Sequence, residues 1–264
     1  MFVKFGLIGK NLTHSLSPKI HKIILDEIEE KGEYLIFDID EDEINCTLKD
    51  CILNGFKGIN ITIPYKIKIM KYLHLIDDKT KIIGACNTIL FKEGCILGLN
   101  TDYFGFSDSL RRNSIPHNNV KVLIVGTGGV SKVVNEFFKS YEGNEIFFVS
   151  REGKGEKIYS YDVLHDIENM DIVINCTPCG MYPNIDNTPI SRTIMKRFKY
   201  AIDLIYNPEE TYFLKIAKEL GLTCLNGFHM LILQAIKAQE IWNNVSIDRD
   251  TSTKIINRCY DDIF

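Results

Sequence analysis

The chain contains 264 residues, 45% of them hydrophobic and 25% charged, with a formal net charge of −4. Such a chain can form two modest domains or one large one with a sizeable core, and its slight acidity gives no electrostatic basis for a nucleic-acid or anionic-membrane partner. The N-terminal stretch FVKFGLIG indicates a strand rather than a signal peptide, and no apolar run is long enough to span a membrane, so we expect a cytoplasmic protein.

Eight cysteines are spread through segments that indicate strands and helices, which favours reduced, buried thiols over a disulfide framework. The pair Cys176 and Cys179 has the spacing of a redox or zinc motif. A zinc site needs further ligands, and no second C-x-x-C or histidine pair accompanies this one, so we predict no metal site.

Apolar periodicity in the first hundred residues predicts strands and helices in turn. We expect strands over residues 3–7, 34–39 and 58–63, and helices over residues 17–32, 44–54 and 67–75. Residues 87–91 and 95–99 indicate a β-hairpin, with Asn87 and Asn100–Asp102 at its two ends in sequence. Periodicity alone does not say whether these polar residues converge.

Three polar residues in this half have more than one interpretation. Ser17 followed by Pro18 is typical of a helix start, with the hydroxyl as N-cap and proline at the first helical position. A structural role is less evident for Ser15, and its hydroxyl could bind a ligand. Lys66 could be a solvated lysine at the start of the helix over 67–75, but the helix dipole disfavours a cation there, which favours a functional role.

The stretch Lys121–Val134, KVLIVGTGGVSKVV, predicts a strand, a glycine turn and a helix start. Gly126, Gly128 and Gly129 would allow close approach of a dinucleotide pyrophosphate to the helix N-terminus. Ser131 stands where the third glycine of the usual motif would be, and a tight turn without a ligand is the alternative.

Further strands are expected over residues 145–149, 171–175, 200–205 and 222–225, with helices around 161–167, 211–220 and 230–242. This alternation predicts an α/β fold with a Rossmann-like, doubly wound parallel sheet. The second strand of that sheet ends in Ser150-Arg151-Glu152, with Lys154 and Lys157 close behind. Arginine at this place suits the 2′-phosphate of NADP, whereas Glu152 would repel it; the cations outnumber the anion and favour NADP.

Together these segments give the chain its resemblance to shikimate dehydrogenase along essentially its whole length. The blocks follow in the order expected of that family, and no single block is decisive. They are His14–Pro18, Asn60–Lys66, Gly84–Thr88, Asn100–Asp102, the glycine loop, Asn175–Met181, Asp203–Pro208, and Asn226-Gly227 leading into Met230-Leu231 and Gln234-Ala235.

The resemblance implies reversible NADP-linked hydride transfer between 3-dehydroshikimate and shikimate, in the biosynthesis of chorismate and the aromatic amino acids. It implies that Lys66 and Asp102 are the catalytic pair. The implied substrate-binding residues are Ser15 and Ser17 at the carboxylate, with Tyr206 near it, and Thr62, Lys66, Asn87, Asp102 and Gln234 at the polyol. The implied cofactor-binding residues are Gly126, Thr127, Gly128, Gly129, Val130, Ser150, Arg151, Glu152, Gly153, Lys154, Gly155, Leu204 and Gly227, with Asp78 more weakly assigned.

The resemblance also implies two domains and a small-molecule substrate, in a monomer or homodimer. Residues 1–102 would bind substrate, completed by C-terminal helices over about 231–264, and residues 103–230 would bind NADP. Two departures from the family's pattern stand out, because Ser150-Arg151-Glu152 keeps only the arginine of Asn-Arg-Thr, and Cys176 and Cys179 are unusual. The alternatives are a broader quinate/shikimate dehydrogenase using NAD, and a non-catalytic ligand-binding regulator on the same scaffold.

Overall fold

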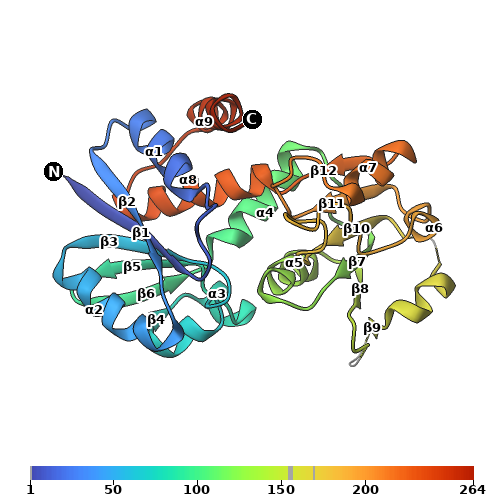
Figure 1. The fold of residues 1–264 in the computed structure, drawn as a ribbon, viewed down its shortest axis with the longest axis horizontal. Coiled ribbons are helices and arrows are strands. Elements are labelled where there is room, and N and C mark those ends of the chain that lie inside the picture. Colours follow the sequence, from blue (N-terminus) through green and yellow to red (C-terminus); the bar gives the residue numbers. More distant parts are fainter. Residues whose placement is uncertain (1, 154–156, 169) are drawn as a thin grey trace. The chain divides into compact units, whose positions relative to one another are not determined.

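The computed structural model of the protein describes residues 2–153, 157–168 and 170–264 (Figure 1). Contacts between Cα atoms divide the chain into two compact units, one formed by Met1–Gly105 with Ile232–Phe264 and the other by Phe106–Leu231. The first unit is therefore assembled from two separate parts of the chain. Each unit is built around its own six-stranded sheet.

The first unit contains a mixed sheet with the strand order β2-β1-β3-β5-β6-β4. β1 is parallel to both β2 and β3, β5 is antiparallel to both β3 and β6, and β4 is parallel to β6. The strands are β1 Val3–Gly9, β2 Gly32–Asp38, β3 Phe56–Ile61, β4 Leu75–Ile76, β5 Thr88–Lys92 and β6 Cys95–Leu99.

Helices from both ends of the chain pack on this sheet. Phe5 of β1 stacks on Trp242 with ring centroids 4.9 Å apart, and the Trp242 indole N–H donates to the Ile89 carbonyl of β5 at 2.8 Å. These contacts fix the C-terminal part of α8 on the sheet. The helices are α1 Ser17–Glu27, α2 Ile44–Leu53, α3 Asp78–Ile83, α4 Thr101–Arg112, α8 Phe228–Asn243 and α9 Arg249–Ile263, with 3-10 segments at Glu41–Glu43 and Lys68–Tyr72. α4 and α8 each contain one boundary between the units.

The second unit contains a parallel sheet with the order β12-β11-β10-β7-β8-β9. The central strand β7 is apolar from Val122 to Val125 and fully buried, as expected of a parallel strand covered on both faces. The elements are β7 Lys121–Val125, α5 Gly129–Lys139, β8 Glu145–Val149, β9 Ile158–Tyr159, the 3-10 segment Tyr161–Asp166, β10 Ile172–Asn175, α6 Arg192–Met195, β11 Tyr200–Asp203, α7 Tyr212–Glu219 and β12 Thr223–Leu225.

The predicted fold class, an α/β chain with a doubly wound, Rossmann-like parallel sheet, is confirmed. Several local predictions are wrong. Residues 67–75 form a short 3-10 helix and then β4 rather than one α-helix, and residues 161–167 are likewise 3-10 rather than α-helical. The short edge strand β9 was not predicted. All eight cysteines are free thiols as expected, but only Cys51, Cys86 and Cys259 are buried; Cys46 is exposed and the other four are half-buried.

The prediction that Ser17 caps α1 is also wrong. Leu16 is the N-cap residue, and Ser17 is the first residue of the helix. The hydroxyl of Ser15 instead accepts a hydrogen bond from the Ser17 backbone N–H at 3.3 Å. The Ser17 side chain is thereby left for other partners.

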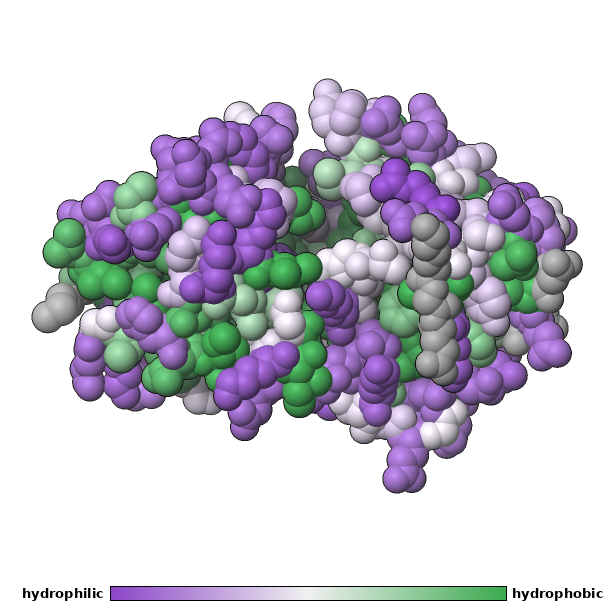
Figure 2. All heavy atoms as spheres, turned by 90° about the horizontal axis from the view of Figure 1, so that it is seen from below, coloured by the Kyte–Doolittle hydropathy of each residue, from purple (hydrophilic) through white to green (hydrophobic). Residues whose placement is uncertain are grey.

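The surface carries polar and apolar residues side by side. On the face drawn in Figure 2, hydrophilic and hydrophobic residues are interspersed. Among the described residues, no helix combines the length and the apolar character that crossing a membrane would require.

Candidate active site

The hairpin of β5 and β6 brings together the polar residues that flank it. Thr88 pairs with Leu99 in the antiparallel register, so the residues just before β5 and just after β6 lie at the same end of the hairpin. The Thr101 backbone N–H donates to Asn87 Oδ1 at 2.7 Å. The convergence of Asn87 with Asn100–Asp102, which periodicity left open, follows from this register.

The same edge of the sheet collects the other predicted substrate residues of the first unit. β1 and β3 are parallel, with Ile8 opposite Ile61, and β3 lies beside β5, with Asn60 opposite Thr88. The carboxyl ends of β1, β3 and β6 and the start of β5 therefore share one edge. The loops and helix starts at this edge carry Ser15, Ser17, Thr62, Lys66, Asn87 and Asp102.

Asp102 lies in the first turn of α4, where a carboxylate is favoured. Asn100 caps that helix, because its Oδ1 accepts the Tyr103 N–H at 3.2 Å while its amide donates to the Ala85 carbonyl at 2.7 Å. Asp102 is then the second residue of the helix, where the dipole stabilises negative charge. The cap thus fixes both the position of the carboxylate and its electrostatic setting.

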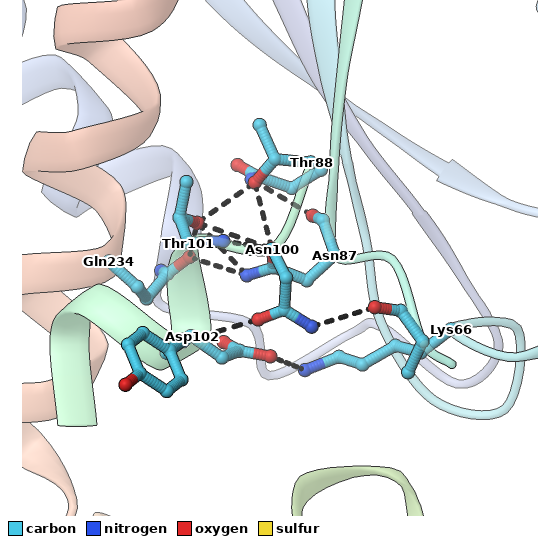
Figure 3. Close-up of polar contacts among 10 residues, drawn as sticks. Lys66, Asn87, Thr88, Asn100, Thr101, Asp102 and Gln234 are labelled. Carbon is cyan, nitrogen blue, oxygen red and sulfur yellow. Dashed lines mark hydrogen bonds and ion pairs between the residues drawn. The ribbon is translucent and has the colours of Figure 1, made fainter. Parts of the chain in front are cut away.

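Lys66 forms an ion pair with this carboxylate. Its Nζ lies 2.8 Å from Asp102 Oδ2, and the two side chains are 21% and 8% exposed (Figure 3). Lys66 sits in the turn that follows β3, and its backbone carbonyl accepts the Cys86 N–H at 2.8 Å. The ammonium group is thus held in a partly open place beside a buried anion.

Buried neutral side chains form a network next to the ion pair (Figure 3). The Asn87 amide donates to Thr101 Oγ1 at 3.0 Å and to Gln234 Oε1 at 3.3 Å. The Thr88 hydroxyl lies 3.0 Å from Asn87 Oδ1 and 2.9 Å from Thr101 Oγ1. Gln234 comes from α8, so the C-terminal part of the chain completes the cluster. Buried polar groups that satisfy one another in this way form a rigid unit.

The network continues toward the loop that carries the serines. Asn60 donates to Thr88 Oγ1 at 3.1 Å and to the Asn87 carbonyl at 3.2 Å, and its Oδ1 accepts the Tyr34 hydroxyl at 2.8 Å. Burial raises the pKa of Tyr34, and a hydrogen bond with Ser17 acts in the opposite direction. A chain of hydrogen-bonded side chains therefore runs from Ser17 through Tyr34, Asn60 and Thr88 to Asn87.

In the second unit, the glycine loop joins β7 to α5. Gly126 has a φ of +102°, in the left-handed region, and Gly128 is the N-cap residue of α5. Because Gly128 has no side chain, the first N–H groups of the helix can turn to an anion. Ser131, which replaces the third glycine, is buried and donates its hydroxyl to the Gly128 carbonyl at 2.6 Å. A serine therefore fits at the place of the third glycine. Thr127, Gly129 and Val130 belong to the same loop and the first helical turn.

The loop after β8 carries the residues expected to select the cofactor. Ser150 is half-buried, and its Oγ accepts the Gly153 N–H at 3.2 Å, which shapes the loop. Arg151 and Glu152 are exposed, so both can reach a ligand. Two other predicted cofactor residues, Lys154 and Gly155, lie outside the described residues.

Leu204, Tyr206 and Gly227 lie close together in the second unit. The Gly227 N–H donates to the Ile205 carbonyl at 3.0 Å, and a Cβ at Gly227 would lie 2.2 Å from the Leu204 carbonyl oxygen. Only glycine fits this close approach of two backbones. Tyr206 is half-buried, and burial raises the pKa of its phenol, which remains a hydrogen-bond donor at neutral pH.

Asp78 and the cysteine pair Cys176 and Cys179 do not belong to the buried polar network. The Asp78 side chain is 95% exposed at the start of α3 and pairs with Lys81 at 3.3 Å, apart from the buried cluster. Cys176 and Cys179 are half-buried, and burial raises the pKa of both thiols, as expected of packing residues rather than reactive ones. No metal-binding group of histidine, cysteine or acidic residues occurs among the described residues.

No functional role was predicted from the sequence for Tyr34, Asn60, Thr88, Thr101 or Asp203. One signal was present, because Asn60 alternates with the apolar residues Ile59 and Ile61 of β3, and Thr62, directly after the strand, continues that alternation. For Tyr34 and Asp203 the sequence held no such signal, since their partners come from distant segments.

The second unit combines a Rossmann-like parallel sheet with a glycine loop, and the first unit holds a lysine–carboxylate pair in a polar cluster. These features together define the class of dinucleotide-dependent oxidoreductases. The model of the shikimate dehydrogenase substrate binding domain matches residues 7–89. A shikimate dehydrogenase (NADP(+)) of Clostridium perfringens is 40% identical over 262 residues, covering 95% of this chain and 96% of that protein. The chain belongs to the shikimate dehydrogenase family.

Solved structures agree with this assignment. Shikimate dehydrogenase 1 from Peptoclostridium difficile is 39% identical with a TM-score of 0.89, and the match covers 97% of each chain. Shikimate 5-dehydrogenase from Thermus thermophilus, solved in complex with NADP(H) and shikimate, is 26% identical with a TM-score of 0.86, over 97% of this chain and 99% of that one.

Proposed function

We propose that this protein is an NADP-dependent shikimate dehydrogenase that interconverts 3-dehydroshikimate and shikimate in the pathway to chorismate. The observation that carries the proposal is the Lys66–Asp102 ion pair, 2.8 Å from Nζ to Oδ2, beside the buried network. A regulator that only binds its ligand does not need an acid–base pair. Retention of both residues in a member of this family therefore favours the enzyme.

Reduction of the ketone requires a hydride at carbon and a proton at oxygen. NADPH, when bound, supplies the hydride. The Lys66 ammonium donates the proton to the ketone oxygen, and the Asp102 carboxylate orients that ammonium and accepts a hydrogen bond from a substrate hydroxyl. In the reverse direction, Lys66 as the neutral amine takes the proton from the hydroxyl that becomes the ketone, and the hydride passes to NADP+.

The remaining polar residues are proposed to hold the substrate. Ser15 and Ser17 bind the carboxylate together with the Tyr206 phenol, and Thr62, Asn87 and Gln234 bind the ring hydroxyls. The structure supports the role of Asn87, because its amide and that of Gln234 lie side by side in the cluster. In the proposed division of labour, the unit of Met1–Gly105 and Ile232–Phe264 binds substrate and that of Phe106–Leu231 binds NADP.

The second unit fits a dinucleotide phosphate on its own geometry. The glycine N-cap of α5 can receive the pyrophosphate, and the exposed Arg151 can pair with a 2′-phosphate. Ser150 can add a hydroxyl. Glu152 in the same loop repels the phosphates of the dinucleotide, and three groups, the N-terminus of α5, Arg151 and Ser150, favour them.

The decisive experiment is an absorbance assay at the reduced-nicotinamide band that crosses shikimate and quinate with NADP+ and NAD+. We expect rapid turnover with shikimate and NADP+. Quinate adds a hydroxyl at the carboxylate-bearing carbon, which Ser15, Ser17 and Tyr206 would crowd. Comparable catalytic efficiency on both acids, or a preference for NAD+, would move the assignment to the broader quinate/shikimate dehydrogenase. Binding of shikimate without turnover would move it to the regulator.

The assembly is proposed to be a monomer or a homodimer. Light scattering during size-exclusion chromatography separates these two states.

A further inference from the structure

Asp203 is a fully buried carboxylate that has no part in the mechanism above. It ends β11 directly beside Asn175, the last residue of β10, and both side chains have no exposed surface. Its oxygens accept three hydrogen bonds from neutral donors: the Thr211 hydroxyl at 2.6 Å, the Asn175 amide at 3.0 Å and the Ile205 N–H at 3.1 Å. Burial raises the pKa of Asp203 to about 6, although the three hydrogen bonds act to lower it. A buried carboxylate held only by neutral donors is costly, so its presence calls for an explanation.

Each of the three donors fixes a different segment. Asn175 accepts both the N–H and the hydroxyl of Thr177 and donates to the Cys179 carbonyl, which shapes the loop after β10. Ile205 lies between Leu204 and Tyr206. Thr211 is the N-cap residue of α7, and its Oγ1 accepts the Leu214 N–H at 3.3 Å.

These segments reach the proposed cofactor residues. A Cβ at Gly126 would lie 2.8 Å from Thr177 Cγ2, so the glycine loop rests against the loop that Asn175 holds. The Ile205 carbonyl accepts the Gly227 N–H at 3.0 Å. Asp203 is thus linked to Gly227 through Ile205 and to Gly126 through Asn175 and Thr177. It also directly precedes Leu204 in the chain.

The sheet topology indicates which half of the dinucleotide these segments would face. The chain passes from β7 outward to β8 and β9, then returns to place β10 and β11 on the other side of β7. A dinucleotide binds at the point where the strand order reverses, here between β7 and β10. With the adenosine phosphate over the end of β8, near Arg151, the nicotinamide half lies over the ends of β10 and β11.

We propose that Asp203 is a positioning residue for the nicotinamide half of the cofactor, because its carboxylate ties the loops after β10 and β11 and the start of α7 into one arrangement. This inference rests on the proposed function. It differs from that function in concerning a residue that touches neither substrate nor cofactor.

The test is the Asp203→Asn variant, which keeps the shape of the side chain but turns an N–H group toward one of the three donors. Asp171→Asn is the matched control. Asp171 also joins strand ends of this sheet, accepting the Lys121 N–H at 2.9 Å and pairing with Lys199 at 2.8 Å, but at the opposite, amino-terminal edge. Binding of NADP+ and of 2′,5′-ADP, the adenosine fragment, is measured by calorimetry for both variants.

We expect Asp203→Asn to weaken NADP+ about tenfold and to change 2′,5′-ADP less than twofold, with Asp171→Asn like wild type for both. Equal weakening of both ligands would show a general structural role, and unchanged NADP+ binding would show that Asp203 positions nothing; either result overturns the proposal. If Asp203→Asn does not fold, Thr211→Val and Thr211→Ser decide. The valine should weaken NADP+ selectively and the serine should not, and equal behaviour of the pair overturns the proposal. A wild-type chain that binds NADP+ but does not oxidise shikimate would overturn the proposed function and leave this binding test valid.

Discussion

The two units each contain a buried carboxylate, and the partners of the two carboxylates differ. Asp102 in the first unit faces a lysine ammonium that is 21% exposed, whereas Asp203 in the second unit is fully buried among three neutral donors. A cation that remains partly open beside an anion can exchange a proton with a ligand. A carboxylate enclosed by neutral donors has no such outlet and can only fix the groups around it. The comparison therefore separates a chemical role from a positioning role.

The largest effect should come from removing the cation of the first unit. We expect Lys66→Ala to lower kcat by about 10²–10⁴, the usual contribution of general acid–base catalysis, with little change in the KM for shikimate, because several other polar groups also hold the ring. Steady-state kinetics with shikimate and NADP+ measure both values. Lys68→Ala is the control, since Lys68 is an exposed neighbour that pairs with Glu41. Near-normal turnover with a raised KM would make Lys66 a binding residue only.

Two buried groups, one in each unit, should make the stability of the fold respond to pH in opposite directions. His21 of α1 is fully buried, and burial lowers its pKa from 6.5 to about 3. Between these values the unfolded chain binds a proton that the folded chain refuses, so acid removes up to about 5 kcal/mol of stability. The pKa of Asp203 rises from 3.8 to about 6, so here the folded chain keeps a proton that the unfolded chain releases. Below pH 4 this raised pKa contributes about 3 kcal/mol to the free energy of unfolding, and that contribution is lost as the pH rises through 6.

Denaturant unfolding from pH 4 to pH 8 checks these signs. His21→Gln should flatten the acid loss of stability, with the exposed His14 as control in His14→Gln. Asp203→Asn should gain stability relative to wild type as the pH rises. Parallel pH profiles for the two variants would contradict the comparison.

A smaller effect is expected at the cofactor loop. Arg151→Ala should weaken NADP+ by roughly ten- to hundredfold, since a charge-assisted contact contributes about 1.5–3 kcal/mol, while NAD+ binding should change little. Arg192→Ala, which removes an exposed arginine paired with Glu219 in the same unit, is the control. Equal weakening of both cofactors would remove Arg151 from phosphate recognition. Unlike Asp203→Asn, this variant should also weaken 2′,5′-ADP, so the two substitutions resolve the two halves of the cofactor.

The sequence was informative wherever a local rule acts. Apolar runs such as Val122–Val125 predict the parallel strands, and a lysine at an apparent helix start singled out Lys66. The physical reason for singling out Lys66 was wrong, because Lys66 lies in a turn and the segment after it forms a 3-10 helix and β4 instead of an α-helix, but Lys66 does pair with Asp102. A short 3-10 helix and a two-residue strand leave too little periodicity to be distinguished from one α-helix.

What the sequence could not supply depends on register and burial. Asn87 and Thr101 meet because Thr88 pairs with Leu99, and Gln234 joins them from α8, far along the chain. The burial of Asp203 depends on Asn175 and Thr211, which lie on other segments. Tertiary pairing decides these contacts, and no local pattern encodes them.

The smallest effect should come from the link between the serine loop and the network. Tyr34→Phe removes the hydroxyl that donates to Asn60 Oδ1 at 2.8 Å and keeps the ring that stacks on His21, with centroids 4.0 Å apart. A neutral hydrogen bond contributes about 1 kcal/mol, so the KM for shikimate should rise roughly fivefold through displacement of Ser17, while kcat and the KM for NADP+ stay within twofold. Tyr141→Phe, which loses a hydroxyl contact with Arg111 in the second unit, is the control. A fall in kcat with an unchanged KM would place Tyr34 with the ion pair instead.

The pattern expected for Tyr34→Phe, an effect on substrate affinity alone, mirrors the effect expected of Asp203→Asn on cofactor affinity alone. In both units the groups one step behind the ligand would then set binding, and only Lys66 with Asp102 would set the rate of the chemical step.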